Sequence, residues 1–168
     1  QPTLIYSGQP EQTGGVSCRG PILIEQEEVE LQLMGLEQRQ SDNDSSCVML
    51  LRYRECTLLI AGDLSSGAEL ELIRLLEPTP ITWLMLSHHG SRTSTSDAWL
   101  DHWQPKTLLV SRGRNNPFGH PHTEVMELVN RRNLELLDTA VDGEIELIAN
   151  DQGCRLSTFY DRQQRYWY

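Results

Sequence analysis

Short runs of apolar residues, each bounded by polar or turn-forming residues, divide the chain into segments of strand length. Val29, Leu31 and Leu33 alternate with polar residues, which is the pattern of a strand with one buried face. The apolar runs 47–53 and 56–61 are separated only by Arg54-Glu55, which predicts a hairpin. The expected strands are 22–25, 28–33, 47–53, 56–61, 81–86, 107–110, 143–149 and 155–160.

Three amphipathic segments between these strands predict helices. Ser66 and Glu69 have the spacing of a helix capping box, and they begin a segment with apolar residues at helical spacing. The other two expected helices cover residues 97–102, opened by Ser94 or Ser96, and residues 123–133. Because strands and helices recur along the whole chain, we predict an α/β fold with a layered sheet. One domain is expected over residues 1–168.

Composition and charge narrow the possible functions. No apolar run approaches the roughly 18–20 residues that would span a bilayer. The chain has 24 acidic and 14 basic residues and a net charge of −10. This balance argues against tight DNA binding by the whole surface, because such binding depends on a basic face. The chain begins with Gln1 rather than Met, and we expect it to be a piece of a longer protein.

The four cysteines lack the C-x-x-C spacing of a zinc site. Cys47 and Cys56 lie in two runs that read as adjacent strands, where small buried thiols are common. We therefore interpret the cysteines as buried thiols. Disulfides are the alternative, and the spacing does not name their pairing.

Ligand-type side chains lie directly after three of the predicted strands. Asp63 follows the strand 56–61, His88 and His89 follow the strand 81–86, and His120 and His122 lie in the loop after residues 107–110. Ligand sites of α/β sheets lie just beyond strand ends. Imidazole and carboxylate groups are the usual ligands of Zn²⁺ and Mn²⁺, so these residues together suggest metal chemistry.

Each of these segments also has a purely structural interpretation. The Gly-Asp pair reads equally as a turn that caps a helix, and the His-His pair as a hydrogen-bonding turn. The Gly-His-Pro-His segment reads as a rigid turn with surface histidines. His102, beside Trp103 on an expected helix, is interpreted as structural. The functional hypothesis depends on the order and spacing of the set.

That ordered set resembles a known family. The segments are Ser-Cys-Val at 46–48, Gly-Asp at 62–63, His-His-Gly-Ser at 88–91 and Gly-His-Pro-His at 119–122. They resemble the C-terminal metallo-β-lactamase-like domain of ComEC-type competence proteins, the channel family that takes up DNA. The resemblance is strongest over residues 43–148. It implies a metallo-β-lactamase-like αββα sandwich, of which this chain would be the C-terminal half.

The resemblance also implies roles for individual residues. Asp63 matches an acidic residue that bridges metals, and His89 is favoured over His88 as a second metal ligand. The positions that match catalytic or substrate-contacting ones are His88, Ser91, Asn116, His120 and His122, with Asn116 expected to contact substrate. His120 or His122 could instead supply a metal ligand.

One departure from the family pattern limits these expectations. The family's first metal-binding motif, His-x-(His or Asp)-x-Asp-His, has no counterpart, because the first histidine of the chain is His88. We therefore expect an upstream half of the domain to complete the site with Zn²⁺ or Mn²⁺. The isolated chain is expected to be inactive and to bind metal weakly or not at all. A half-domain would leave a sheet partly uncovered, which favours a homodimer.

The leading hypothesis is a metal-dependent phosphodiesterase of nuclease type that acts on incoming DNA. It would be part of a DNA-uptake channel, on the outer face of the cytoplasmic membrane. The first alternative is a non-catalytic domain that assembles the channel or guides DNA. The second is a related hydrolase of another phosphoester or of a lactone.

Overall fold

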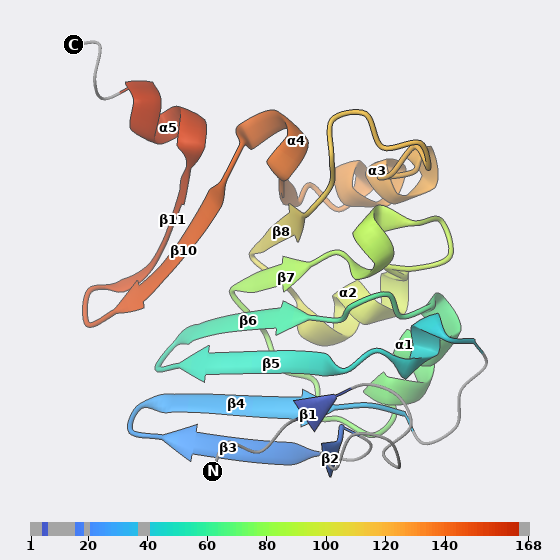
Figure 1. The fold of residues 1–168 in the computed structure, drawn as a ribbon, viewed down its shortest axis with the longest axis vertical. Helices are drawn as coiled ribbons and strands as arrows, with labels where there is room; N and C mark the ends of the chain where they lie inside the picture. Colours follow the sequence, from blue (N-terminus) through green and yellow to red (C-terminus); the bar gives the residue numbers. More distant parts are fainter. Residues whose placement is uncertain (1–4, 7–15, 19–20, 37–40, 165–168) are drawn as a thin grey trace.

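A seven-stranded mixed sheet forms the centre of the protein in the computed structural model, which describes residues 5–6, 16–18, 21–36 and 41–164. The strand order is β3-β4-β5-β6-β7-β8-β9 (Figure 1). The strands are β3 (Ile22–Gln26), β4 (Val29–Met34), β5 (Val48–Tyr53), β6 (Cys56–Ile60), β7 (Trp83–Met85), β8 (Thr107–Val110) and β9 (Glu135–Asp138). The predicted hairpin is confirmed, with Tyr53 paired to Cys56.

The direction of the strands changes at β6. From β3 to β6 each neighbouring pair is antiparallel, whereas β6, β7, β8 and β9 run parallel. Parallel neighbours need crossover connections, and helices supply them here. The carboxyl ends of β6, β7 and β8 therefore meet at one edge of the sheet. Strand β9 was not predicted, because Glu135-Leu-Leu-Asp138 has only two apolar residues between acidic ends.

Helices cover one face of the sheet. They are α1 (Ser66–Ile73), α2 (Asp97–Trp103) and α3 (Thr123–Arg131). Their apolar residues pack with one face of the strands in a single buried core, in which Trp99 and Trp103 of α2 are almost fully buried. The expected helix over 123–133 ends two residues earlier, and the expected helix over 97–102 begins after Ser96, whose side chain accepts from the backbone N–H of Trp99.

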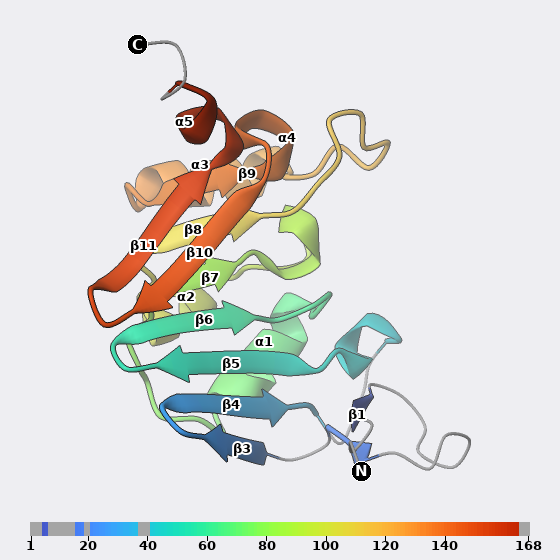
Figure 2. The ribbon, with the colours of Figure 1, turned by 60° about the vertical axis from the view of Figure 1, so that its left-hand side comes forward.

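A hairpin of β10 (Ile145–Asn150) and β11 (Gly153–Thr158) covers part of the opposite face, in front of the parallel strands (Figure 2). Leu147 and Leu156 of the hairpin belong to a second, smaller core with Trp83 and Leu109 of the sheet. The structure is therefore layered, with helices, sheet and hairpin in that order. The remaining elements are β1 (Ile5–Tyr6), β2 (Val16–Ser17), α4 (Thr139–Asp142), α5 (Phe159–Gln164) and the 3₁₀ turns Asn43–Ser45 and Ser87–Gly90.

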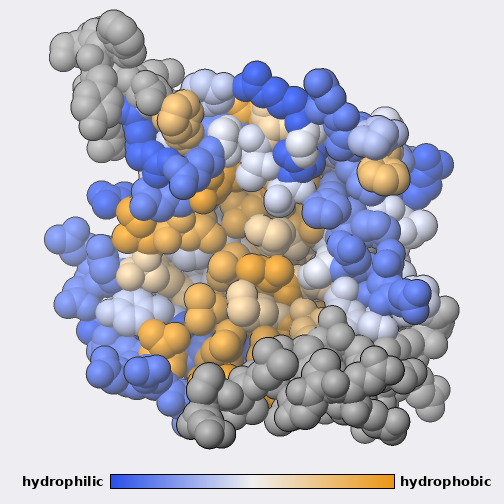
Figure 3. All heavy atoms as spheres, viewed as in Figure 1, coloured by the Kyte–Doolittle hydropathy of each residue, from blue (hydrophilic) through white to orange (hydrophobic). Residues whose placement is uncertain are grey.

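The rest of that face is apolar and lies outside the hairpin (Figure 3). Ile24 and Val29 are 42% and 40% exposed, and with Leu31 and Leu51 they line a shallow hollow over β3, β4 and β5. Within the described part of the chain, this face of the sheet is thus only partly covered. Within the described part of the chain, none of the helices has the length and apolar character needed to cross a membrane.

The expected α/β class is confirmed, and its layers are compatible with an α/β sandwich. The single domain expected over 1–168 includes residues outside the described ranges and stays a prediction. The cysteines correct the sequence interpretation, because all four are paired, Cys18 with Cys47 and Cys56 with Cys154. The two pairs are 29 and 98 residues apart, so chain spacing did not reveal them.

Candidate functional site

Three turns meet at the edge where the parallel strands end, and they carry every residue that the sequence proposed. Gly62-Asp63 follows β6, residues 87–91 follow β7, and the loop 111–122 follows β8. The backbone N–H of His88 donates to the carbonyl of Gly62 at 2.8 Å, which joins the first two turns. Parallel pairing of the strands thus brings residues from distant parts of the sequence together.

The turn after β7 has an unusual backbone. His88 and His89 both have positive φ, 49° and 56°, a conformation that few residues other than glycine adopt. Such backbone persists only where the surrounding structure holds it, and it is common at functional sites. His122 provides one such restraint, because its N–H donates to the carbonyl of Gly90 at 2.9 Å.

Glu69 of α1 forms hydrogen bonds with both ends of the segment 87–96, which contains this turn. Its carboxylate accepts from the Ser87 hydroxyl at 2.8 Å and from the backbone N–H groups of Thr95 and Ser96 at 2.7 and 2.9 Å. The side chain is fully buried, and burial raises the pKa of Glu69 against the opposing effect of these hydrogen bonds. The predicted capping box is therefore wrong. Ser65, not Ser66, caps α1, since its hydroxyl accepts from the N–H of Ala68.

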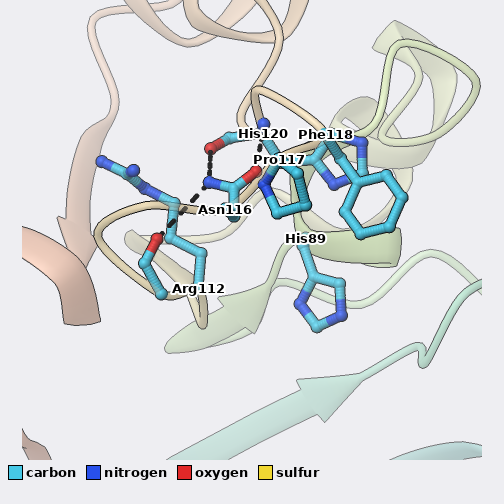
Figure 4. A pocket seen from close by; sticks show the side chains of 7 residues that line it. His89, Arg112, Asn116, Pro117, Phe118 and His120 are labelled. Carbon is cyan, nitrogen blue, oxygen red and sulfur yellow. Dashed lines mark hydrogen bonds between the residues drawn. The ribbon is translucent and has the colours of Figure 1, made fainter.

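The loop 111–122 is closed by Asn116, which the sequence had proposed as a substrate contact. The Asn116 amide accepts from the backbone N–H of His120 and donates to its carbonyl, both at 2.9 Å (Figure 4). Both polar atoms of Asn116 are therefore used within the loop. The His120–Pro121 peptide bond is cis. A Cβ built on Gly90 would lie 2.7 Å from the Cβ of Pro121, so the two turns pack closely.

Four histidines converge where these turns meet. The ring centroid of His120 lies 4.7 Å from that of His122, 5.6 Å from that of His88 and 6.5 Å from that of His89. His89 is exposed, and the other three are half-buried. Burial first, and then the nearby histidines and Arg92, lower the pKa of His120. His120 is therefore neutral at pH 7 and offers a lone pair.

Hydrogen bonds to the backbone determine which ring nitrogen carries a proton in two of the histidines. Nδ1 of His89 lies 2.7 Å from the carbonyl oxygen of Ser111, so Nδ1 donates and the neutral ring has its lone pair on Nε2. Nδ1 of His122 accepts from the backbone N–H of Arg92 at 3.2 Å, so the neutral ring carries its proton on Nε2. The site thus contains both an acceptor and a donor imidazole.

Asp63 and Ser91 occupy different positions relative to this cluster. The Asp63 backbone N–H donates to the Ser46 hydroxyl at 3.0 Å, so the Ser-Cys-Val segment holds the Gly-Asp turn. Buried Asp44 accepts from the N–H of Ser65 at 3.1 Å just beyond that turn. Ser91 is 6% exposed, and its hydroxyl lies 3.1 Å from that of Thr93. Ser91 is therefore bonded within its own turn.

The donor atoms do not form a metal centre by themselves. Among the described residues, the one group of three possible ligands whose donor atoms lie within 4.8 Å of one another is Glu55, Cys56 and Cys154. Both cysteines of that group are in a disulfide, which leaves no thiolate to bind a metal. Asp63 and His89 thus do not make a three-ligand site with another described residue. The described residues therefore do not by themselves form a three-ligand site for the implied Zn²⁺ or Mn²⁺.

Sequence reasoning missed two residues that shape the site. Glu69 was interpreted only as part of a capping box, and Asp44 was given no role, yet both carboxylates are buried. Asp44 also accepts from the hydroxyl of Ser41, three residues away, but its contact with Ser65 spans 21 residues. The partners of Glu69 are 18–27 residues away, so the local pattern does not identify them.

Comparison with known proteins relates the chain to four curated sequences, whereas no protein-family model matches it. It is 33% identical over 106 residues to ComE operon protein 3 of Bacillus subtilis, and 35% identical over 108 residues to Recombination protein 2 of Haemophilus influenzae. It is 30% identical over 145 residues to Competence protein ComA of Neisseria gonorrhoeae. The matches cover 63%, 64% and 84% of this chain.

The same matches cover 14%, 14% and 21% of those relatives, so the chain spans about a fifth of their length or less. The chain is thus a homologue, over part of its length, of proteins named for competence and for recombination.

Proposed function

We propose that this chain is part of a DNA-uptake protein and that its histidine cluster binds the phosphodiester backbone of incoming DNA. The observation that carries the proposal is the convergence of His88, His89, His120 and His122 at one edge of the sheet. The names of the relatives support the biological setting. In the parent protein, the same site would belong to a phosphodiesterase domain of nuclease type.

The charge distribution favours an anion at this edge despite the net charge of −10. The segments 87–96 and 105–123 contain no Asp or Glu, but they contain Arg92, Lys106, Arg112 and Arg114, of which Lys106 lies at the opposite end of β8. Arg112 forms an ion pair with Asp138, and the Arg114 guanidinium donates to the hydroxyl of Tyr160. Arg92 is exposed, and no ion pair of its side chain is found within the described ranges. Its charge is therefore available to a phosphate.

The two imidazole tautomers suit the two sides of a phosphodiester. Nε2–H of His122 can donate a hydrogen bond to a non-bridging oxygen, and Nε2 of His89 can accept from a water or a hydroxyl. Metal-assisted hydrolysis needs more than these groups, because no three-ligand site with Asp63 or a histidine is found among the described residues. We therefore assign substrate binding and proton positioning to this chain, and we propose that the metal ligands are completed from an upstream half of the domain.

Two disulfides favour an oxidising compartment. This agrees with a location on the outer face of the cytoplasmic membrane, attached to a membrane channel, where incoming DNA arrives. The channel and the upstream half are the proposed partners.

Binding of a fluorescent oligonucleotide at low salt tests the proposal. Arg92→Ala and His122→Ala should each weaken binding by about 5-fold or more, which corresponds to roughly 1 kcal/mol for a lost charged hydrogen bond. Lys106→Ala is the matched control, since Lys106 is an exposed cation at the opposite end of β8. Equal losses in Arg92→Ala and Lys106→Ala would mean that general charge, not this site, attracts DNA.

Nuclease activity is tested separately with Mn²⁺ and Zn²⁺. We expect a longer chain that includes the upstream half to cut DNA, and the 168-residue chain and the Asp63→Ala variant of the longer chain not to cut. A longer chain that binds DNA without cutting it would favour the second candidate, a domain that guides DNA. The incomplete ligand set of the described residues is the observation that favours this candidate.

A further inference from the structure

We infer that the pocket beside the histidine cluster is a stacking site for an unpaired nucleobase, with the Phe118 ring as its platform. This inference deepens the proposed function and rests on it, since the histidines would hold the adjoining phosphate. It adds a second binding subsite with a different chemistry, which recognises the base rather than the backbone.

The exposure of Phe118 is the first observation. Its side chain is 72% exposed, and it lies in a loop whose other side chains are polar, proline or glycine. An aromatic ring that is left in water at the tip of a closed loop contributes little to the core. Because the Asn116 side chain accepts from the N–H of His120 and donates to its carbonyl, the backbone on either side of Phe118 is held by hydrogen bonds.

The arrangement of rings is the second observation. The Phe118 and His120 rings are stacked, with centroids 5.9 Å apart and an angle of 27° between their planes. The His120 and His89 rings are also nearly parallel, at 23° and 6.5 Å. The His120 ring is thus close to parallel with each of the other two rings. A planar aromatic ligand could stack on the exposed face of Phe118 beside them.

The pocket itself is the third observation. Its walls are His89, Arg112, Gly113, Asn116, Pro117, Phe118 and His120 (Figure 4). The volume is about 210 Å³, smaller than the roughly 300–1,000 Å³ of sites for drug-sized ligands. It therefore suits one planar ring system rather than a larger molecule. The Arg112 guanidinium is turned to Asp138, so the pocket offers mainly ring and backbone surface to a ligand.

The position of the pocket links the two subsites. His89 and His120 belong both to the pocket wall and to the histidine cluster. A nucleotide has an apolar base face joined to an anionic phosphate, and the site has an aromatic pocket joined to a cluster of histidines with Arg92. Base stacking on aromatic side chains tolerates any sequence, and in a duplex the base faces are covered. The pocket therefore selects unpaired DNA without selecting a sequence.

The test compares two probes on the 168-residue chain, a short oligothymidylate and an abasic deoxyribose-phosphate oligomer of equal length. Phe118→Ala should weaken binding of the oligothymidylate by about 5- to 150-fold, the range of one lost base stack, and leave binding of the abasic oligomer unchanged. Phe118→Trp should retain or strengthen binding. Phe159→Ala is the matched control, because Phe159 is the other phenylalanine of the chain and is 42% exposed on α5.

The outcomes separate this inference from the proposed function. If both probes bind equally and Phe118→Ala changes neither, the stacking site is refuted, while a loss caused by His122→Ala would still support phosphate binding. If Phe118→Ala acts on the oligothymidylate but His122→Ala and Arg92→Ala act on neither probe, the base site stands and the phosphate assignment falls. If the chain binds neither probe at low salt, both are refuted.

Discussion

Replacement of Glu69 gives the sharpest test of how the fold holds the site. Glu69→Ala removes the carboxylate that accepts from the Ser87 hydroxyl and from the N–H groups of Thr95 and Ser96. Each buried donor left without a partner costs about 1–3 kcal/mol, and release of a buried charge offsets part of that sum. We expect the free energy of unfolding to fall by about 3–5 kcal/mol, a large share of the roughly 5–15 kcal/mol of a typical domain.

Glu69→Gln separates the hydrogen bonds from the charge. One oxygen of Glu69 accepts from both Ser87 and Thr95, and the other accepts from Ser96. Glutamine can keep the first oxygen, but its NH₂ group then faces the N–H of Ser96. We therefore expect a smaller loss of about 1–2 kcal/mol, from one hydrogen bond. Glu71→Ala on the same helix is the control, because no hydrogen bond of the half-buried Glu71 side chain is found among the described residues.

Urea unfolding with the disulfides intact measures these losses. Trp99 and Trp103, buried on α2 directly after the Glu69 contacts, report unfolding through their fluorescence. A loss in Glu69→Ala below about 1 kcal/mol, or no larger than that of Glu71→Ala, would refute the reasoning. The same variants should also weaken oligonucleotide binding, because the backbone of His88 and His89 depends on the segment that Glu69 holds.

The raised pKa of Glu69 determines how the free energy of unfolding should change with pH. The pKa of Glu69 in the folded protein is raised above 4.5 by burial, so between 4.5 and the folded value the native state binds more protons than the unfolded chain. Stability contributed by the protonated carboxyl is present below 4.5 and is lost as the pH rises through the folded pKa. The stability difference between wild type and Glu69→Gln should therefore narrow with rising pH. A difference that widens would contradict the raised pKa.

Three further predictions concern the turns, the disulfides and the open face. Gly90→Ala should destabilise the protein by about 1–3 kcal/mol and abolish oligonucleotide binding, since Gly90 has φ +81° and no room beside Pro121. Gly113→Ala, with open space around the added methyl group, should leave urea unfolding unchanged. Removal of the Cys56–Cys154 disulfide, which closes a loop of 98 residues, should lower the free energy of unfolding by about 4.7 kcal/mol, more than the roughly 3.6 kcal/mol expected for the disulfide that closes 29 residues. Equal losses in urea unfolding would show that loop length does not set the difference. Leu51→Lys on the open apolar face should weaken self-association of the chain in sedimentation equilibrium, and an unchanged association constant would place any homodimer contact elsewhere.

The sequence by itself determined the features that depend on neighbouring residues. Alternation of apolar residues located β4, two short apolar runs located β5 and β6, and helical spacing located α3. It also placed Asp63 and four histidines directly after strands. These inferences held because a half-buried strand or helix repeats its apolar residues with a fixed spacing along a short stretch of sequence. They also held because polar residues cluster where an apolar run ends.

Tertiary structure alone decided which of these residues meet. The parallel order of β6, β7 and β8 brings His89 to within 6.5 Å of His120, and packing of Gly90 on Pro121 sets their relative position. The burial of Glu69 and the pairing of Cys56 with Cys154 also depend on residues far along the chain. The local sequence pattern does not identify such partners, because the burial, pKa and tautomer of a side chain depend on its surroundings.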